Sequence, residues 1–312
     1  MNLLERYIRE ISLELDTNTV KNYKSYLNTF FKFLKEEKDV ENIDDIIYLL
    51  NKEKRYLVND YKFYLLEKYA SGTVNSYLIG LYSFITFLDD MGEVNKENIM
   101  PKVIKVKYKA KKEKEVLTLD EVKKVLKQMG IRTKGDRDFE YNSLRNKVIF
   151  SLEYTIGLRA TEFLNLKLDQ IEENETGLFI NTNAAMNKTE NENRLPIVGL
   201  AKDYFKEYML MRKEMGIKSD LVICKKDGSK LTKEGTANMI KKYVKLAGIN
   251  KNISNHNCRH FLATYLSNKN VNDDKIKAIL GQENNDVLNK YYKKTKDTKE
   301  YDNMLVKTVN IL

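Results

Sequence analysis

The chain has 312 residues, of which 42% are hydrophobic, and it carries a formal net charge of +10 from 55 Lys and Arg against 45 Asp and Glu. This length suits two domains of ordinary size, and this hydrophobic content excludes a wholly disordered chain. The positive charge favours a polyanionic partner such as nucleic acid, although a solvated lysine-rich surface has the same composition.

The sequence also restricts the compartment. The only two cysteines, Cys224 and Cys258, supply neither a disulfide scaffold nor a cysteine-based zinc site. Residues 1–16 mix acidic with apolar side chains and lack the basic start and apolar run of a secretory signal. The sequence contains no run of about 18 apolar residues, the length that would predict a membrane span. We therefore expect a cytoplasmic protein.

The N-terminal part of the chain has the hydrophobic period of helices, and only two prolines occur in the whole sequence. Thr17 or Asn18 would cap the second of these helices. Four helices joined by short turns predict a compact helical domain over residues 1–100. The predicted helices span about residues 3–13, 17–37, 52–69 and 73–91.

Residues 101–115 differ in composition from the sequence on either side. The segment begins with Pro101, and residues 102–114 contain seven lysines and one acid. We interpret it as a linker between two domains. It would lie as a basic strap along a phosphate backbone or serve as a solvated connector.

A second domain is predicted over residues 116–312. A capping box formed by Thr118 and Glu121 would start its first helix. Residues 177–198 hold two strand-like runs around a polar turn, which predicts a small antiparallel sheet. The fold class is therefore mainly α: a helical N-terminal domain plus a mixed α+β domain with a small antiparallel sheet. Further helices are predicted at residues 143–156, at residues 160–166 and across residues 200–289. A short strand at residues 221–225 is an alternative within the last of these ranges.

The first cluster of candidate functional residues is TIGLRATE, residues 155–162. A helix that looks buried from its apolar sequence ends near Gly157, and another begins after Arg159. The guanidinium of Arg159 therefore lies at a joint between two helices, from which it can point into a cleft. The alternative is a plain ion pair between Arg159 and Glu162, which are one helical turn apart.

The second cluster holds both histidines of the chain beside an arginine. Ser254 or Asn255 would cap a helix that begins here, which places His256 and Arg259 on one face of its first turn, with His260 next to them. A helix N-terminus favours a phosphate group. The alternative is a capped helix with a packed histidine, since no acid or cysteine completes a zinc pattern of the HExxH type.

The third cluster is ILGQ at residues 279–282, followed by NNDVLNKYY at residues 284–292. Gly281 is expected to end one helix, and the asparagines to cap the next. Tyr291 and Tyr292 lie near the end of that second helix. Taken alone, two tyrosines on a basic helix are more often packing residues than nucleophiles.

In this order the clusters resemble the tyrosine recombinase, or phage integrase, family. GLRATE looks like its first arginine box, NKTENENRLPI like its hairpin lysine and R-x-P strand, HNCRHFLATYL like its second box, and ILGQ…KYY like its final box. The resemblance covers residues 116–294, and the N-terminal helices resemble the family's SAM-like core-binding domain.

The resemblance implies a catalytic set. Arg159 and Arg259 would bind the scissile phosphate, and planar guanidinium groups suit paired phosphate oxygens. Lys188 would protonate the leaving 5′ oxygen, His256 would assist proton transfer, and Tyr291 would be the nucleophile.

The chain departs from the family at Gln282, where His or Trp is usual. Glutamine donates a hydrogen bond but carries no charge. Glu162 and His260 match supporting positions. Tyr292 is the alternative nucleophile, but adjacent helical residues point about 100° apart, and the family's spacing from residue 282 favours Tyr291.

The implied activity is site-specific cutting and rejoining of DNA through a 3′-phosphotyrosine intermediate. The expected partner is double-stranded DNA, bound by a homotetramer on paired sites, with no membrane. No cofactor or metal is expected, because the phosphotyrosine conserves the bond energy. The alternatives are a type IB topoisomerase-like relaxation enzyme and a catalytically impaired DNA-binding protein. The apolar tail at residues 304–312 would dock on a neighbouring protomer or on its own domain.

Overall fold

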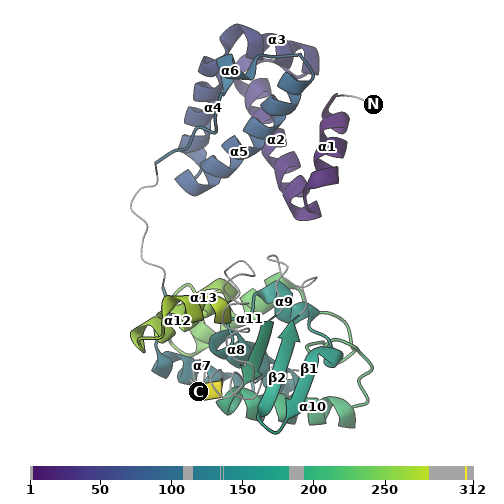
Figure 1. Cartoon of the computed structure of the whole chain (residues 1–312), viewed down its shortest axis with the longest axis vertical. Coiled ribbons are helices and arrows are strands. Elements are labelled where there is room, and N and C mark those ends of the chain that lie inside the picture. Colours follow the sequence, from purple (N-terminus) through teal and green to yellow (C-terminus); the bar gives the residue numbers. More distant parts are fainter. Residues whose placement is uncertain are drawn as a thin grey trace. The chain divides into compact units, whose positions relative to one another are not determined.

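The computed structural model describes residues 3–107, 115–133, 135, 137–182, 193–280 and 306–307. The chain divides into two compact units, Met1–Lys112 and Glu113–Leu312 (Figure 1). The division falls inside the basic segment that the sequence marks as a linker. Within the described part of the chain, no helix is both long and apolar enough to cross a membrane.

The first unit consists of helices packed around an aromatic core. Tyr7, Phe30 and Tyr61 are fully buried, and the rings of Phe30 and Tyr61 meet edge-on with 5.0 Å between their centroids. Edge-on pairs of this kind add to the stability gained from apolar burial. The helices described here are α1 (Leu3–Glu14), α2 (Thr17–Lys38), α3 (Ile43–Glu53), α4 (Arg55–Lys68), α5 (Ser71–Asp90) and α6 (Lys96–Ile99).

Two predictions for this unit need correction. The helix predicted at residues 52–69 is α4, which begins only at Arg55 because the chain turns at Lys54, whose φ is +55°. Four helices were predicted, and the additional ones are α3, which ends just before that turn, and the short α6. The cap of α2 is Asp16 and neither Thr17 nor Asn18. The Asp16 Oδ1 atom accepts a hydrogen bond from the Asn18 amide at 3.0 Å, and a carboxylate also suits the positive end of a helix.

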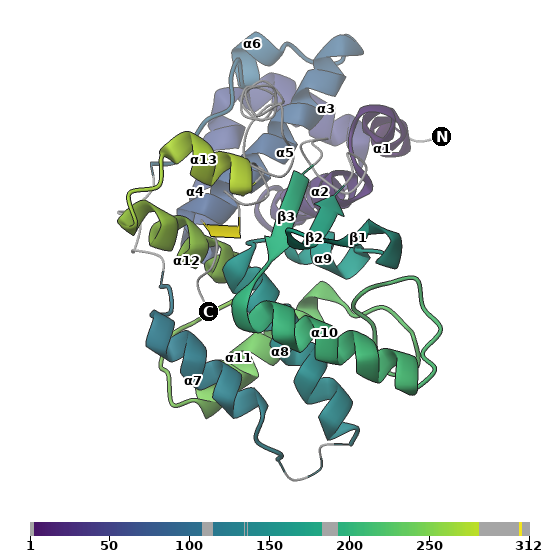
Figure 2. The same ribbon diagram turned by 60° about the horizontal axis from the view of Figure 1, so that its bottom comes forward.

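The second unit is arranged around one buried helix, α8 (Phe139–Thr155), which starts earlier than the predicted residue 143. Because α8 is buried on nearly all sides, it needs a partner on each face. Helices α7 (Leu119–Met129), α10 (Gly199–Glu214) and α12 (Asn255–Asn268) provide them (Figure 2). The capping box of Thr118 and Glu121 starts α7 as predicted. The remaining helices described in this unit are α9 (Ala160–Asn165), α11 (Lys233–Leu246) and α13 (Asp273–Ile279).

A small antiparallel sheet lies in the same unit, in the order β1 (Ile171–Asn174), β2 (Gly177–Thr182), β3 (Asn193–Ile197). Ile180 pairs with Leu195, and both side chains are buried in the core beneath the sheet. The predicted fold class, mainly helical with a small antiparallel sheet, is confirmed. The strand option at residues 221–225 is wrong, since Leu221 makes only an isolated bridge to Lys167.

The C-terminal part is described only in places. Helix α13 ends at Ile279, and the predicted helix end at Gly281 and the helix after it lie outside the described residues. Val306 packs against the core cluster that contains α7 and α12 of its own unit.

Candidate active site

The joint between α8 and α9 is a turn that only glycine fits. Gly157 has a φ of +69°, and a Cβ atom there would lie 2.9 Å from a methyl carbon of Leu262 and 2.9 Å from one of Leu280. A side chain would therefore be strained by its backbone conformation and would also clash. The joint lies directly against α12 and against the residue that follows α13.

Arg159 follows this joint at the N-terminus of α9. Its backbone N–H donates to Glu162 Oε2 at 2.7 Å, and its Nη1 group donates to Glu162 Oε1 at 2.6 Å. The ion pair considered as an alternative from sequence is therefore present. It also positions the arginine, because Glu162 is only 4% exposed while the Arg159 side chain remains 32% exposed.

Arg259 lies on the first turns of α12 and is nearly buried. Its Nη1 group donates to the Gly157 carbonyl oxygen at 2.7 Å, and its Nη2 group donates to the Leu280 carbonyl oxygen. Burial, and then the positive charge of Arg159, lowers the pKa of Arg259 to about 10, so it stays charged at neutral pH. An oxyanion bound by both guanidinium groups would relieve their mutual repulsion.

The two histidines lie one turn apart on α12. Their Nε2 atoms are 3.0 Å apart, and the rings meet edge-on with 4.4 Å between centroids. A hydrogen bond between these nitrogens needs one donor and one acceptor. Because His256 is exposed and His260 is half-buried, His256 is the member of the pair that can meet a substrate. Ser254, one of the two predicted caps, is the N-cap of α12.

A buried polar network that sequence analysis missed lies under the start of α12. Asn255 Nδ2 donates to Glu153 Oε1 at 2.8 Å and to Thr236 Oγ1 at 3.0 Å. Glu153 is 1% exposed, its Oε2 atom has no hydrogen-bond partner among the residues that the structure describes, and burial raises its pKa to about 8. This network ties α8, α11 and α12 together. The signal in the sequence was one carboxylate inside the otherwise apolar end of the predicted helix at residues 143–156.

The hairpin of β2 and β3 is braced by an arginine. The Nη1 and Nη2 groups of Arg194 donate to the two carboxylate oxygens of Glu172 at 2.7 and 2.8 Å. The Arg194 guanidinium also lies 4.1 Å from the centre of the Phe179 ring. Hydrogen bonding from Arg194, first among several contacts, lowers the pKa of Glu172 to about 2. This pair links β3 to β1 at the edge of the sheet.

The structure thus brings together three of the six predicted catalytic residues, Arg159, His256 and Arg259, where α9 and α12 meet the end of α8. The other three lie outside the described residues. These are Lys188, in the segment between β2 and β3, and Gln282 and Tyr291, after α13.

A largely helical unit with a small antiparallel sheet and paired arginines at a helix N-terminus is suited to act on a phosphodiester. The chain matches the model of the phage integrase family over residues 115–298. This match covers more than half of the sequence, and the protein belongs to that family.

Curated relatives match along nearly the whole chain. The tyrosine recombinase XerD of Listeria monocytogenes serovar 1/2a is 25% identical over 286 residues, which cover 90% of each protein. The tyrosine recombinase XerC of Halalkalibacterium halodurans is 27% identical over 291 residues, covering 90% of this chain and 88% of that protein.

Solved structures show the same fold at lower identity. A λ integrase dimer bound to a COC′ core site has a TM-score of 0.67 at 16% identity and covers 92% of this chain and 97% of that one. The XerH recombinase bound to its difH substrate has a TM-score of 0.63 at 18% identity and covers 89% of this chain and 79% of that one.

Proposed function

We propose that the protein is a site-specific DNA recombinase that cuts and rejoins DNA through a 3′-phosphotyrosine intermediate. The observation that carries this is the meeting of Arg159 and Arg259 at the start of α12, in a chain of the phage integrase family. Each guanidinium can donate to two phosphate oxygens, and the N-terminus of α12 adds a partial positive charge.

The chemical step is a transesterification. The hydroxyl oxygen of Tyr291 bonds to the phosphorus while the bond from phosphorus to the 5′ oxygen breaks, and that oxygen takes a proton from Lys188. His256 assists removal of the proton that the Tyr291 hydroxyl loses, and Gln282 donates a hydrogen bond to a non-bridging oxygen. Reversal of the same step with a new 5′ hydroxyl rejoins the strand, so no ATP is consumed.

The substrate is double-stranded DNA. Exchange of strands between two duplexes cuts four strands in total, which requires four active sites and therefore a homotetramer on paired sites. We place this reaction in the cytoplasm.

A nicked duplex that traps the covalent intermediate tests the proposal. The wild-type protein should form an adduct that survives denaturing electrophoresis. Tyr291→Phe removes one hydroxyl group and should bind the same duplex with unchanged affinity but form no adduct. Tyr292→Phe is the matched control and should still form it.

Each other outcome contradicts part of the proposal. An adduct with the Tyr291→Phe protein would move the nucleophile to Tyr292. Binding without any adduct from the wild-type protein would indicate a DNA-binding protein with an impaired site. Relaxation of supercoiled plasmid with no recombinant product would indicate a topoisomerase.

A further inference from the structure

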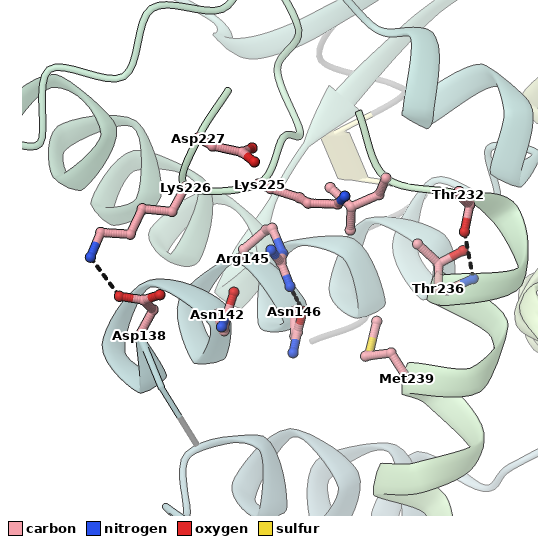
Figure 3. Close-up of a pocket in the computed structure, with 12 residues that line it drawn as sticks. Asp138, Asn142, Arg145, Asn146, Lys225, Lys226, Asp227, Thr232, Thr236 and Met239 are labelled. Carbon is pink, nitrogen blue, oxygen red and sulfur yellow. Dashed lines mark hydrogen bonds and ion pairs between the residues drawn. The ribbon is translucent and has the colours of Figure 1, made fainter. Parts of the chain in front are cut away.

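A cavity lies in the second unit of the chain, Glu113–Leu312, which is the proposed catalytic unit. The paired arginines are not among its lining residues. It has a volume of about 710 Å³ and opens between the first half of α8, the loop at residues 225–227 and the first turns of α11 (Figure 3). Arg145 lines it from α8, ten residues before the end of that helix, or about 15 Å along its axis. This volume is in the range of small-molecule sites.

Arg145 is the unusual residue of this cavity. Its Nη2 group donates to Asn146 Oδ1 at 3.0 Å, whereas its Nε atom is buried without an acceptor. Within the part of the chain that the structure describes, Arg145 has no further hydrogen-bond acceptor and no carboxylate within ion-pair distance. The side chain as a whole is half-buried, and a guanidinium largely withdrawn from water normally has such a partner.

Arg212 provides the contrast within the same unit. It is more deeply buried than Arg145, and its guanidinium donates to the carbonyl oxygens of Ser219, Leu221 and Val222. A structural arginine in this fold is therefore saturated by backbone oxygens. Arg145 makes one such bond, to a side chain, and it lines an open cavity.

The other charged groups of the cavity leave a positive excess on the same side. Asp138 accepts from Lys226 Nζ at 2.5 Å, and Asp227 Oδ1 accepts from the Ser229 amide at 2.9 Å. Both carboxylates thus have partners, while Lys225 is exposed and makes no ion pair with the described residues. The first turn of α11 adds its partial positive charge at the cavity wall.

We propose that this cavity binds a phosphate-bearing small molecule of about nucleotide size, in addition to the DNA bound at the active site. The phosphate group would lie between Arg145 and Lys225, where a guanidinium and an ammonium supply charge-assisted hydrogen bonds. The less polar part of the molecule would contact Leu231 and Met239, the apolar residues of the lining.

The test measures equilibrium binding of inorganic pyrophosphate and of ATP to the full-length protein by calorimetry, in EDTA and at constant ionic strength. The wild-type protein should bind at least one of them. Arg145→Gln and Lys225→Gln should each weaken that binding about tenfold or more. Lys213→Gln, on the exposed face of α10, is the control and should bind like the wild type.

If Arg145→Gln fails to fold, Lys225→Gln still tests the proposal. Lys225 is exposed, so its substitution should leave the fold intact. The probe should also bind when the protein is saturated with duplex DNA. Three results would overturn the proposal: no binding of either probe, equal binding by the Lys225 and Lys213 variants, or displacement of the probe by DNA. The last would make the cavity part of the DNA-contacting surface.

Discussion

Backbone carbonyl oxygens hold Arg259, one of the two arginines proposed to bind the phosphate. Arg259 donates to the Gly157 and Leu280 carbonyls, which fixes the plane of the guanidinium. A guanidinium has five N–H donors in a rigid fork, so donors remain for a phosphate. The position of Arg259 therefore depends on the turn at Gly157 as much as on the arginine itself.

Gly157→Ala should destabilise the catalytic unit and weaken cleavage. The backbone at a φ of +69° and the two contacts at 2.9 Å both oppose a Cβ atom, so we expect a loss of roughly 2–4 kcal/mol. Urea denaturation and adduct formation on the nicked duplex measure the two effects.

Gly216→Ala is the matched control. Gly216 has a similar φ of +63°, but nothing lies within 4 Å of the point that a Cβ atom would occupy there. Only the conformational cost applies, about 1–2 kcal/mol, and cleavage should be unchanged. If both variants lose the same stability, the joint has room for a methyl group and the argument from close packing is wrong.

Helix α12 carries the histidines and Arg259, and its start is anchored by the buried pair of Asn255 and Glu153. Burial raises the pKa of Glu153 to about 8, above its ordinary value of 4.5. The folded unit therefore binds a proton that the unfolded chain releases. The contribution of Glu153 to stability is fully present below about pH 4.5 and is lost as the pH rises to about 8.

Glu153→Gln should remove this pH dependence, because glutamine stays neutral and still accepts from Asn255. The free energy of unfolding of the wild type, relative to the variant, should fall by a few kcal/mol between about pH 5 and pH 8. Urea unfolding at several pH values, read by brief labelling of thiols at one common pH, measures it. Cys224 and Cys258 are both buried in this unit, so the labelling reports on it alone.

Glu214→Gln is the control for this experiment, since Glu214 is exposed at the end of α10. It should leave the pH dependence of unfolding as in the wild type. A parallel pH profile for the wild type and Glu153→Gln would mean that Glu153 is charged in the folded protein.

Local signals explain which elements were predicted from sequence. The capping box at Thr118 lies within four residues and was predicted correctly. Strand β1 was missed, because IEEN is short and acidic and becomes a strand only through its pairing with β2. Helix α3 was missed as well.

The candidate site likewise contains residues that local sequence motifs indicate and residues that they do not. Arg159, His256 and Arg259 could be proposed from sequence because they lie in short motifs. Their supports lie far away along the chain: Gly157 and Leu280 for Arg259, and Glu153 for the start of α12. Contacts between distant residues are formed by the tertiary fold, and a single sequence does not display them.

For the whole molecule, the charge of +10 predicts DNA binding that weakens steeply with salt. A protein that contacts about 6–10 phosphates should lose roughly 10³–10⁵ in affinity between about 50 and 200 mM salt. Fluorescence anisotropy of a labelled duplex over a series of salt concentrations gives the slope. A flat response would be incompatible with an extensive phosphate interface.

The same measurement distinguishes the two interpretations of the basic segment. Replacing Lys102, Lys105 and Lys107 with glutamine should reduce the salt slope by about 0.9 for each lost phosphate contact if the segment lies along DNA. An unchanged slope would identify it as a solvated connector.

The docking site of the C-terminal tail can be tested through Val306. Val306 is half-buried against the core that contains Cys258 and lies near Gly177, which is the arrangement expected if the tail docks on its own unit. Val306→Ala should then lower the stability of this unit by about 1 kcal/mol, measured by urea unfolding with thiol labelling. Truncation after Asp302 should lower the stability of the unit at least as much.

Lys307→Ala, at an exposed neighbour of Val306, is the control and should have no effect on this stability. If truncation left stability and single-site DNA binding intact but abolished the complex of two DNA sites, the tail would act on a neighbouring protomer instead.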